Sequence, residues 1–570
     1  MPQKPKIHKK PNPRKDKDAV RIIPLGGLEE VGRNMCLIEY RNEILIIDMG
    51  LQFPEENMPG IDYIIPNISY LKGKEKNIRG VIITHGHYDH IGAIPHLIPR
   101  LGRPTVYGTK LTLAIIAKRQ EDYRNSGKLI THAVDNNSRL KLGGFHVEFF
   151  GVSHNIPGSL GIIVDTPLGK IVHTGDFKID LNPSGDTPTD IAKIAQLHNQ
   201  NVLALMSDST NASQPGHQFT EQEIMGNMED IFRTAQGRLI IGTFASLLGR
   251  IKQIVDLAQK YNRVVILDGY SLRTNVEIAT ELGYMKAKPG TFITYKDMKR
   301  YPSQRVLILC TGAQGEDRAV LMRLANREHK FTKIERNDTV VFSSSVVPGN
   351  ERSVQYLVDT LYREGAEVIN YKMMDIHAGG HAKQEDLKLM IKLVHPRFLI
   401  PIEGNHSFLK MHAKLAISIG FSEKNIFVAD NGQIMEFNKA GGRLTNQRVP
   451  TEYVMVDGLG VGDVSNVVLR DRQQLAADGM VVVIATIETQ TGKIVGDPDI
   501  ISRGFIYMKG SQQLIEETRR KVKNIISEDR EPKSALNETY IKNKIRDNIG
   551  QYLFSKTERR PMILPVIIPV

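Results

Sequence analysis

The sequence VIITHGHYDHIGAIPHLI, from Val81 to Ile98, places three histidines and one aspartate within six residues. The apolar, β-branched run before them predicts a buried strand, and the apolar run after them is compatible with a helix. Polar side chains at the edge of a core need partners, because burying them without partners is costly. The chain therefore has either a hydrogen-bonded polar turn here or a site that holds a ligand.

The spacing of these four side chains favours a metal site. His85 and His87 are two residues apart, and Asp89 and His90 follow directly. A tight turn after a strand can direct all four into one cavity, whereas a helix would spread them around its circumference. Neutral imidazole and carboxylate are ligands of Zn²⁺ and Mn²⁺. One isolated histidine would more often bond to the backbone, but this cluster predicts metal binding.

Three more polar residues stand at the ends of predicted strands. Asp48 ends ILIID, His154 follows FFGVS, and Asp176 follows IVHTG. A single residue of this kind usually caps a turn, but three of them beside a cluster that needs partners indicate a shared site. We expect one ion to be held by His85, His87 and His154 and a second by Asp89 and His90, with Asp176 bridging the two.

The size and composition of the chain limit its class. A chain of 570 residues exceeds what one core normally serves, so two to four domains are expected. The sequence has no apolar stretch long enough for a bilayer and no secretory signal at its amino terminus. Cys36 and Cys310 are too few for a disulfide framework, which predicts a reducing cytoplasm.

The net charge of +12 favours a polyanionic partner, most commonly nucleic acid. A basic surface that only keeps the protein in solution is the alternative. The first residues are rich in lysine and have no apolar pattern, so we expect a disordered basic tail.

The pattern along the chain predicts an α/β protein. Short apolar strands separated by turns begin at Val20, and regular helix–strand alternation follows Gln218, which is typical of a parallel sheet buried on both faces. Further elements are expected as helices at 109–125, 221–235, 248–261, 406–419, 511–526 and 533–554, and as strands at 397–404, 425–430 and 562–570.

The motifs of this chain resemble those of a known family. HGHYDH with Asp48, His154 and Asp176 resembles the metallo-β-lactamase fold. SDST, CTGAQGE, SSSVVPGNE and HAGGHA resemble the β-CASP branch, whose members cut nucleic acids. The order of these segments and the final GLGVGDV, DGMVVVIATI and GDPDIISRGFIY resemble bacterial ribonuclease J.

The resemblance implies an αββα metallo-β-lactamase sandwich, an inserted α/β β-CASP domain with a parallel sheet, and a small α+β carboxyl-terminal domain. The expected boundaries are a tail at 1–18, the first part of the lactamase domain at 19–218, the β-CASP domain at 219–376, the second part of the lactamase domain at 377–448, a linker at 449–465 and a dimerisation-type domain at 466–570.

The resemblance also implies two divalent ions per subunit, Zn²⁺ or Mn²⁺. It assigns His85, His87, His154 and Asp176 to one ion, Asp89, His90 and Asp176 to the other, and an orienting role to Asp48. Catalysis is expected from Asp89, Asp208 and His381. Binding of substrate is expected at Ser209, Ser345, His377, Ala378, Gly379, Gly380 and His381.

The chain departs from the family pattern at three positions. Glu403 stands where a histidine usually binds the second ion, and its oxygens would favour Mn²⁺ or Mg²⁺. His406 is an alternative ligand, although it also fits the start of a helix. Leu247 and Gly379 replace the usual Asn and Ser, which concerns contacts to RNA.

The predicted function is a cytoplasmic, metal-dependent ribonuclease that acts in RNA maturation and decay. It would trim single-stranded RNA from a 5′-monophosphate end in the 5′-to-3′ direction and also cut internally. We expect a homodimer or homotetramer, or an assembly with a paralogous subunit, and no membrane association. The alternatives are a catalytically weak RNA-binding subunit and a hydrolase of small esters or lactones.

Overall fold

A computed structural model describes residues 18–55, 57–123, 126–183, 186–316, 319–344, 346, 350–370, 379–458, 460–464, 466–506, 511–528 and 538–570. The chain divides into two compact units, one formed by Met1–Gln52 and Ile65–Tyr453 and the other by Phe53–Ile64 and Val454–Val570. The expected basic tail lies outside the described residues, apart from Asp18.

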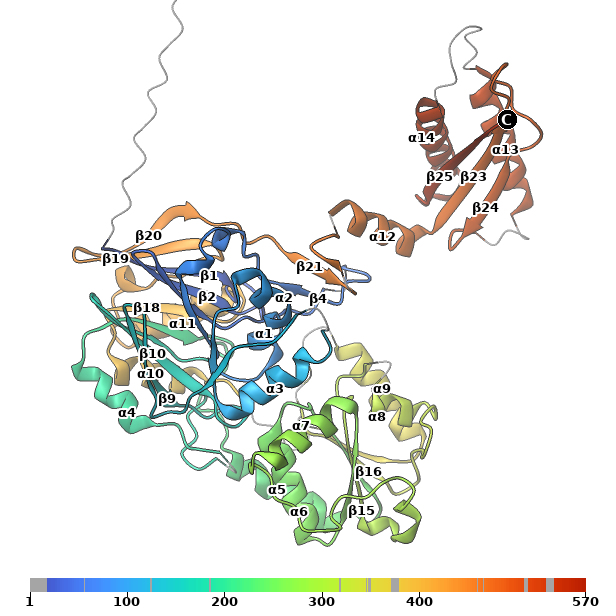
Figure 1. Cartoon of the computed structure of the whole chain (residues 1–570). Coiled ribbons are helices and arrows are strands. Elements are labelled where there is room, and N and C mark those ends of the chain that lie inside the picture. The colour runs from blue at the N-terminus through green and yellow to red at the C-terminus, as the bar shows by residue number, and fades with distance from the viewer. Residues whose placement is uncertain are drawn as a thin grey trace, which may run out of the picture. The chain divides into compact units, whose positions relative to one another are not determined.

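The first unit contains a mixed sheet of eight strands (Figure 1). Its central strands are entirely or almost entirely buried, as their continuous apolar sequences predict. In spatial order the strands are β20 (Gly441–Arg448), β19 (Gln433–Asn438), β1 (Val20–Gly26), β2 (Met35–Tyr40), β3 (Glu43–Ile47), β5 (Ile78–Ile82), β6 (Val106–Gly108) and β7 (Thr131–Ala133).

A second sheet of six strands packs against the first. Side chains such as Ile22 and Ile82 of the first sheet share one buried core with Phe149 and Ile162 of the second. In order the strands are β18 (Phe398–Ile402), β12 (Val202–Asp208), β11 (Gly169–His173), β10 (Leu160–Thr166), β9 (Phe145–Gly151) and β8 (Arg139–Leu142).

Helices cover the outer faces of this sandwich. Leu387, Met390 and Ala416 pack on the second sheet, in a core that also includes Val172 and Leu205. These side chains come from α10 (Gln384–Val394) and α11 (His406–Ser418), which pack against each other, and α10 also lies beside α4 (Ile191–Gln196) (Figure 1). On the first sheet, α3 (Lys110–Gln120) packs against β6 and β7, and α1 (Tyr88–Ile91) and α2 (Ile94–Leu97) precede it.

The segment between β12 and α10 forms an inserted α/β domain. All its strand pairs are parallel, and its core joins β-strand residues such as Ile308 to helix residues such as Leu357. The strand order is β14 (Val264–Asp268), β15 (Val306–Cys310), β13 (Leu239–Gly242), β16 (Thr339–Phe342) and β17 (Glu367–Asn370). Its helices are α5 (Glu221–Thr234), α6 (Leu248–Lys260), α7 (Tyr270–Glu281), α8 (Val320–Ala325) and α9 (Glu351–Arg363).

A buried network of charges ties the inserted domain to the sandwich. Lys178 Nζ lies 2.8 Å from Glu221 Oε1, and Arg250 Nη2 lies 3.0 Å from Glu221 Oε2. The Glu221 backbone N–H also donates to Asp180 at 3.0 Å. Because Lys178 and Asp180 are fully buried, these groups depend on one another for compensation of their charges.

The second unit is built around two small sheets. One is formed by β22 (Gly460–Val461), β21 (Val454–Asp457) and β4 (Tyr63–Ile65). The other has the order β24 (Asp499–Arg503), β23 (Met480–Ile487) and β25 (Met562–Pro569). Side chains of α13 (Gln512–Glu528) and α14 (Glu538–Thr557) bury one face of this second sheet, and α12 (Asn466–Asp478) precedes it.

The predicted fold class is confirmed, including the parallel sheet of the insert. Two local expectations differ. Residues 425–430 do not form a strand: Asn425 ends a short 3-10 helix, Glu423–Asn425, and Ile426 makes one isolated bridge to Leu399. The segment expected as a plain linker, 449–465, contains β21 and β22, which pair with each other. The domain boundaries themselves stay predictions.

No helix among the described residues combines the length and the apolar character needed to cross a membrane.

Glu221→Gln should destabilise the protein. Burial acts to raise the pKa of Glu221, but the charges of Arg250 and Lys178 outweigh it and lower that pKa to about 2. Since the unfolded value is higher, this carboxylate stabilises the fold above about pH 4.5, and its contribution falls as the pH drops toward 2. The glutamine variant leaves two buried cations poorly compensated, which should reduce the free energy of unfolding by about 3 kcal/mol at pH 7.

Chemical denaturation of the full chain measures this loss. Glu121→Gln is the matched control, because Glu121 makes an exposed pair with Lys118 and should change the free energy of unfolding by less than about 1 kcal/mol. Equal effects of the two substitutions would contradict a structural role for the buried network.

Candidate metal centre

The sheet topology brings the polar strand ends together. Strands β11, β12 and β18 are parallel neighbours in one sheet, and β3 and β5 are parallel neighbours in the other. The carboxyl ends of parallel strands meet at one edge. Asp176, Asp208 and Glu403 follow or end the first three strands, while Asp48 and the HGHYDH segment follow β3 and β5.

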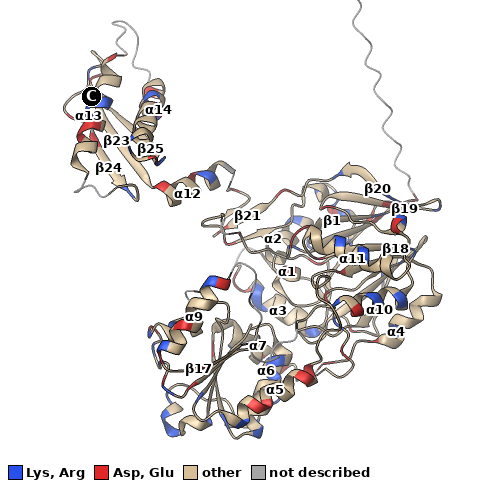
Figure 2. Cartoon of the chain, turned by 180° about the vertical axis from the view of Figure 1, so that it is seen from behind, with Lys and Arg blue, Asp and Glu red and all other residues tan. Residues whose placement is uncertain are grey.

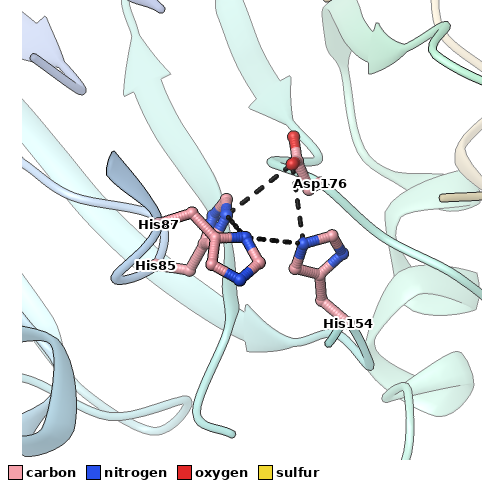
Figure 3. Close-up of side chains that lie close together, drawn as sticks. All are labelled: His85, His87, His154 and Asp176. Atoms are coloured by element: carbon pink, nitrogen blue, oxygen red, sulfur yellow. Dashed lines mark hydrogen bonds and ion pairs between the residues drawn. The ribbon is translucent and has the colours of Figure 1, made fainter. Parts of the chain in front are cut away.

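Three imidazoles and one carboxylate converge as the first group (Figure 3). His87 Nδ1 lies 3.1 Å from His85 Nε2 and 3.1 Å from His154 Nε2. Asp176 Oδ2 lies 3.6 Å from each of the same two Nε2 atoms. A tetrahedral ion with ligand bonds of about 2.0–2.1 Å has ligand atoms about 3.3–3.4 Å apart. The four atoms therefore fit the corners of one such site.

The three histidines of this group are in the form that binds cations. Burial lowers the pKa of His85 and His154 well below the usual value and lowers that of His87 to about 4. Neutral imidazole is the ligating species. His87 Nε2 is buried and has no hydrogen-bond partner among the described residues. No acceptor at this nitrogen therefore favours the protonated form of the ring.

Neighbouring groups fix which nitrogen of each ring faces the centre. Thr84 Oγ1 lies 3.0 Å from His85 Nδ1, and the carbonyl oxygen of Gly380 lies 2.7 Å from His154 Nδ1. A Cβ atom at Gly380 would approach His154 Cε1 to 2.4 Å, so only glycine brings its carbonyl this close. With their Nδ1 atoms engaged, His85 and His154 present Nε2 to the site.

Asp89, His90 and Asp176 form a second group that shares Asp176 with the first. His90 Nε2 lies 3.5 Å from Asp89 Oδ2 and 3.4 Å from Asp176 Oδ1. The two oxygens of Asp176 thus face different groups, as a bridging carboxylate would. Burial acts to lower the pKa of His90, but the charges of Asp176, Asp89 and Asp48 outweigh it and raise that pKa well above the usual value.

Asp48 supports this second group from behind. Its carboxylate accepts from His90 Nδ1 at 2.8 Å and from the backbone N–H and hydroxyl of Thr84 at 2.8 and 2.9 Å. Asp48 has a backbone φ of +60°, which is strained for a residue other than glycine. The three bonds fix the carboxylate against His90 and Thr84, and the orienting role of Asp48 stays a prediction.

Glu403 follows β18 in the same edge of the sheet. Its backbone N–H donates to Gly27 at 3.0 Å, and its φ of +59° is also strained. Burial and the charge of Asp176 raise the pKa of Glu403 well above its usual range. His406, the alternative ligand, is instead a surface residue at the start of α11, where its Nδ1 lies 2.6 Å from Glu29 Oε1.

Asp208 and His381 form a third group with Asp176. His381 Nδ1 lies 2.9 Å from Asp208 Oδ2 and 3.9 Å from Asp176 Oδ2. Burial acts to lower the pKa of His381, but the charges of Asp208 and Asp176 outweigh it and raise that pKa to about 9. The pKa of His381 therefore favours the protonated imidazole beside Asp208 and Asp176.

The remaining assignments for substrate binding divide into three cases. Ser345, His377 and Ala378 lie outside the described residues. Gly379 stands against Gln218 and Asn211. Ser209 is fully buried, and its hydroxyl contacts His412 Nδ1 at 3.0 Å, so this side chain supports the loop and does not face the site.

Sequence reasoning missed two side chains that contact the ligand histidines. Thr84 touches His85 and Asp48, and its place directly before HGHYDH is the one signal that pointed to it. Asn34 Nδ2 lies 3.0 Å from His90 Nε2. Nothing in the sequence near Asn34 connects it to a site 56 residues away.

Comparison with known families accounts for most of the chain. Residues 28–216 match the metallo-beta-lactamase superfamily, residues 236–361 match the description "Ribonuclease J, beta-CASP domain", and residues 467–570 match the "Ribonuclease J C-terminal domain". The superfamily match implies the use of divalent metal, in agreement with the clustered ligand groups.

Several full-length proteins are similar to this chain. Ribonuclease J2 of Bacillus subtilis (strain 168) is 40% identical over 98% of this chain and 100% of its own length. Ribonuclease J 1 of Streptococcus pyogenes serotype M3 is 39% identical over 96% of this chain and 97% of its own length. Ribonuclease J 2 of Staphylococcus aureus (strain MRSA252) is 37% identical over 97% of this chain and 99% of its own length.

A crystal structure of a protein of unknown function from Enterococcus faecalis V583 has a TM-score of 0.54 and 14% identity, and covers 74% of this chain and all of its own. That likeness concerns the fold alone. The profile matches and the full-length relatives confirm the predicted class, a metal-dependent ribonuclease. The chain belongs to the ribonuclease J family, within the β-CASP branch of the metallo-β-lactamase superfamily.

Proposed function

We propose that this chain hydrolyses RNA at a centre of two divalent cations, trimming from a 5′-monophosphate end in the 5′-to-3′ direction and also cutting internally. The observation that carries the proposal is the pair of ligand groups that share Asp176, one oxygen facing each group. These residues would hold two cations, which when bound would supply activation of water and neutralisation of the charge of a phosphodiester.

His381 is the proposed acid. Its ring is protonated at neutral pH because of Asp208 and Asp176, and its Nδ1–H is directed to Asp208. The opposite nitrogen is then free to donate a proton to the departing 3′ oxygen. Asp208 keeps the ring in this orientation, in the way that a carboxylate orients a catalytic histidine.

Charge supports an RNA substrate. The chain carries a net charge of +12. Lys and Arg positions occur on α3, α10 and α11 of the sandwich and on helices of the inserted domain, where Figure 2 colours the ribbon blue. Binding of a polyanion to such a surface releases counterions, so affinity should fall steeply as salt rises. Hydrolysis of a neutral ester or lactone would lack this dependence.

The two proposed cations differ in their surroundings. The first group offers three nitrogens and one oxygen, which suits Zn²⁺ or Mn²⁺. The second group has Glu403 nearby in place of the usual histidine, and its oxygens favour Mn²⁺ or Mg²⁺. The same replacement motivates the alternative of a catalytically weak RNA-binding subunit, which metal content and turnover of the isolated protein distinguish.

We also propose that the protein associates through its carboxyl-terminal sheet, as a homodimer or homotetramer or with a paralogous subunit. The face of β23 and β25 not covered by α13 and α14 carries Val482 beside Leu564, and Thr486 beside Ile568. Leu564 and Ile568 are 47% and 44% exposed. An apolar sheet face of this kind is typical of subunit contacts.

The two buried, unpaired cysteines agree with action in the cytoplasm.

His87→Ala and Asp176→Asn should each abolish RNA cleavage, because each removes a ligand of the proposed centre. RNA binding should stay within a few-fold of the parent. The assay uses 5′-labelled RNA with a mono- or triphosphate end, and metal-stripped protein supplied with Mn²⁺, Mg²⁺ or Zn²⁺. Released mononucleotide from the monophosphate substrate indicates 5′ trimming, and internal fragments indicate endonuclease activity.

Asp165→Asn is the matched control for this assay, since Asp165 is a half-exposed residue on β10 paired with Lys170. It should cleave at the parent rate. A His87→Ala variant that cleaves at the parent rate would exclude the proposed centre, and an inactive parent that still binds RNA would favour the RNA-binding subunit.

Asp48→Asn should weaken cation binding by about 10–100-fold, as expected when a group that orients a ligand histidine is lost. The amide has one oxygen where the carboxylate has two, so it loses one of the acceptors that contact His90 and Thr84. Competition with a chromophoric chelator measures the affinity, again with Asp165→Asn for comparison. Unchanged affinity in Asp48→Asn would show that the orienting bonds are dispensable.

Leu564→Glu should raise the dissociation constant for self-association by at least about tenfold, because it buries an uncompensated charge in the proposed contact. Sedimentation over a range of protein concentrations measures the change. Tyr540→Glu alters an exposed residue of α14, which covers the opposite face of the sheet, and should leave association intact. Equal behaviour of the two variants would place the subunit contact elsewhere.

A further inference from the structure

Asn34 approaches the second ligand group from the loop between β1 and β2. Its backbone is fixed on both sides, because Asn34 N–H donates to the carbonyl of Asp89 at 3.0 Å and Gly50 N–H donates to the carbonyl of Asn34 at 2.8 Å. The side chain is buried and its Nδ2 lies 3.0 Å from His90 Nε2. A residue outside the recognised motifs is therefore built into the site.

The nitrogen that Asn34 faces is the one available for a cation. His90 Nδ1 is engaged with Asp48 at 2.8 Å, so Nε2 is the ring nitrogen that faces the site. The same Nε2 lies within 3.5 Å of Asp89 and Asp176 oxygens. The Asn34 carboxamide thus stands at the position where a second cation would bind.

The carboxamide can serve that position in either of two orientations. As it stands, Nδ2 faces the imidazole, while Oδ1 is buried and has no hydrogen-bond partner among the described residues. A half-turn of the amide group exchanges these two atoms, which are nearly equal in size. Oδ1 then replaces the N–H that would repel a cation, and an amide oxygen is a good ligand for hard ions.

Glu403 provides a second buried oxygen without a partner. Glu403 Oε2 lacks a hydrogen-bond partner among the described side chains. Glu403, Asn34 and Asp48 line one cavity of about 20 Å³ that is otherwise mostly apolar and lies behind the ligand group, since Asp89, His90 and Asp176 do not line it. Gly27 provides the room, since its φ is +88° and a Cβ atom there would stand 2.3 Å from Asn34 Oδ1. Two buried oxygens without partners mark a place that needs a cation or a donor.

We propose that Asn34 Oδ1 is a ligand of the second cation, together with Asp89, His90, Asp176 and Glu403. This set offers one nitrogen and oxygens from four side chains, a composition that suits Mn²⁺ or Mg²⁺ and disfavours Zn²⁺. The three-histidine position keeps its preference for Zn²⁺. The proposal rests on the two-cation function above and assigns different ions to its two positions.

The test measures cation binding directly and needs no activity. Full-length, metal-stripped protein is loaded with one equivalent of Zn²⁺ and titrated with Mn²⁺, and free Mn²⁺ is followed by electron paramagnetic resonance. The parent should bind one further Mn²⁺ per chain. Asn34→Ala should raise the dissociation constant for Mn²⁺ by about tenfold or more, while retention of Zn²⁺ changes less than about twofold.

Asn275→Ala is the matched control, because Asn275 is a partly buried asparagine of the inserted domain whose Nδ2 donates to a backbone carbonyl. It should bind Mn²⁺ like the parent. Asn34→Asp keeps the shape of the side chain and supplies a permanent oxygen ligand, so it should bind Mn²⁺ at least as tightly as the parent. This variant tests the proposal even where the alanine variant fails to fold, as checked by thermal denaturation in chelator.

The outcomes separate the inference from the function it rests on. Folded Asn34→Ala that binds Mn²⁺ within twofold of the parent overturns the role of Asn34, and so does Asn34→Asp that binds Mn²⁺ more weakly than the parent. A parent that takes up only Zn²⁺, or Zn²⁺ at both positions, overturns the assignment of ions. A parent that binds both ions as expected but leaves RNA intact overturns the ribonuclease proposal alone.

Discussion

The buried carboxylates at the edge of the sandwich are the constraint on which the site depends. Asp48, Asp176, Asp208 and Glu403 are all almost completely removed from solvent. Charges in such a place are tolerated only where other charges or metal ions compensate them. His90 and His381 respond by holding protons more tightly, while His85, His87 and His154 stay neutral. The arrangement therefore gathers carboxylates and imidazoles of the kinds that bind divalent cations.

The position of the inserted domain follows from the same topology. Strands β12 and β18 pair directly in one sheet, yet the whole insert lies between them in the sequence. The chain leaves the sheet just after Asp208 and returns before His381 and β18, at the edge where the carboxylates meet. The buried contacts of Lys178 with Glu221, two residues after Asp176, connect this edge to the insert. An extended substrate bound by the insert would thus be held next to the cation ligands.

The sequence predicted the parts of this structure that are local or that have a fixed motif. HGHYDH follows an apolar strand, so the clustering of its polar side chains could be predicted. The continuous Val/Ile strands after Gln218 predicted the parallel sheet that β13 to β17 form. The contacts of Asn34 with His90 and of Glu221 with Lys178 were not recognisable. They depend on which strands become neighbours and in what register, and no periodicity within a single segment contains that information.

Residues 425–430 illustrate the opposite error. The apolar run NIFVAD has the composition of a strand, but Phe427 packs against Phe398 and Phe437 in the core, and one bridge from Ile426 replaces a ladder. Burial explains the apolar side chains without a sheet. The place of Ser209 next to Asp208 in the motif did not indicate the direction of its hydroxyl, which turns inward to His412. Its role in binding substrate stays a prediction.

Glu403 gives the replaced histidine a specific physical meaning. Loss of a ligand would leave a gap or an apolar side chain, whereas Glu403 places a longer, oxygen-bearing group beside Asp176 in a backbone conformation that is itself strained. Strain of this kind persists only where the surroundings enforce it, and Gly27 supplies the backbone acceptor that does so. A position that has a carboxylate, a strained backbone and an adjoining amide offers oxygen atoms where the family usually has an imidazole, which agrees with the proposal of a site for Mn²⁺ or Mg²⁺.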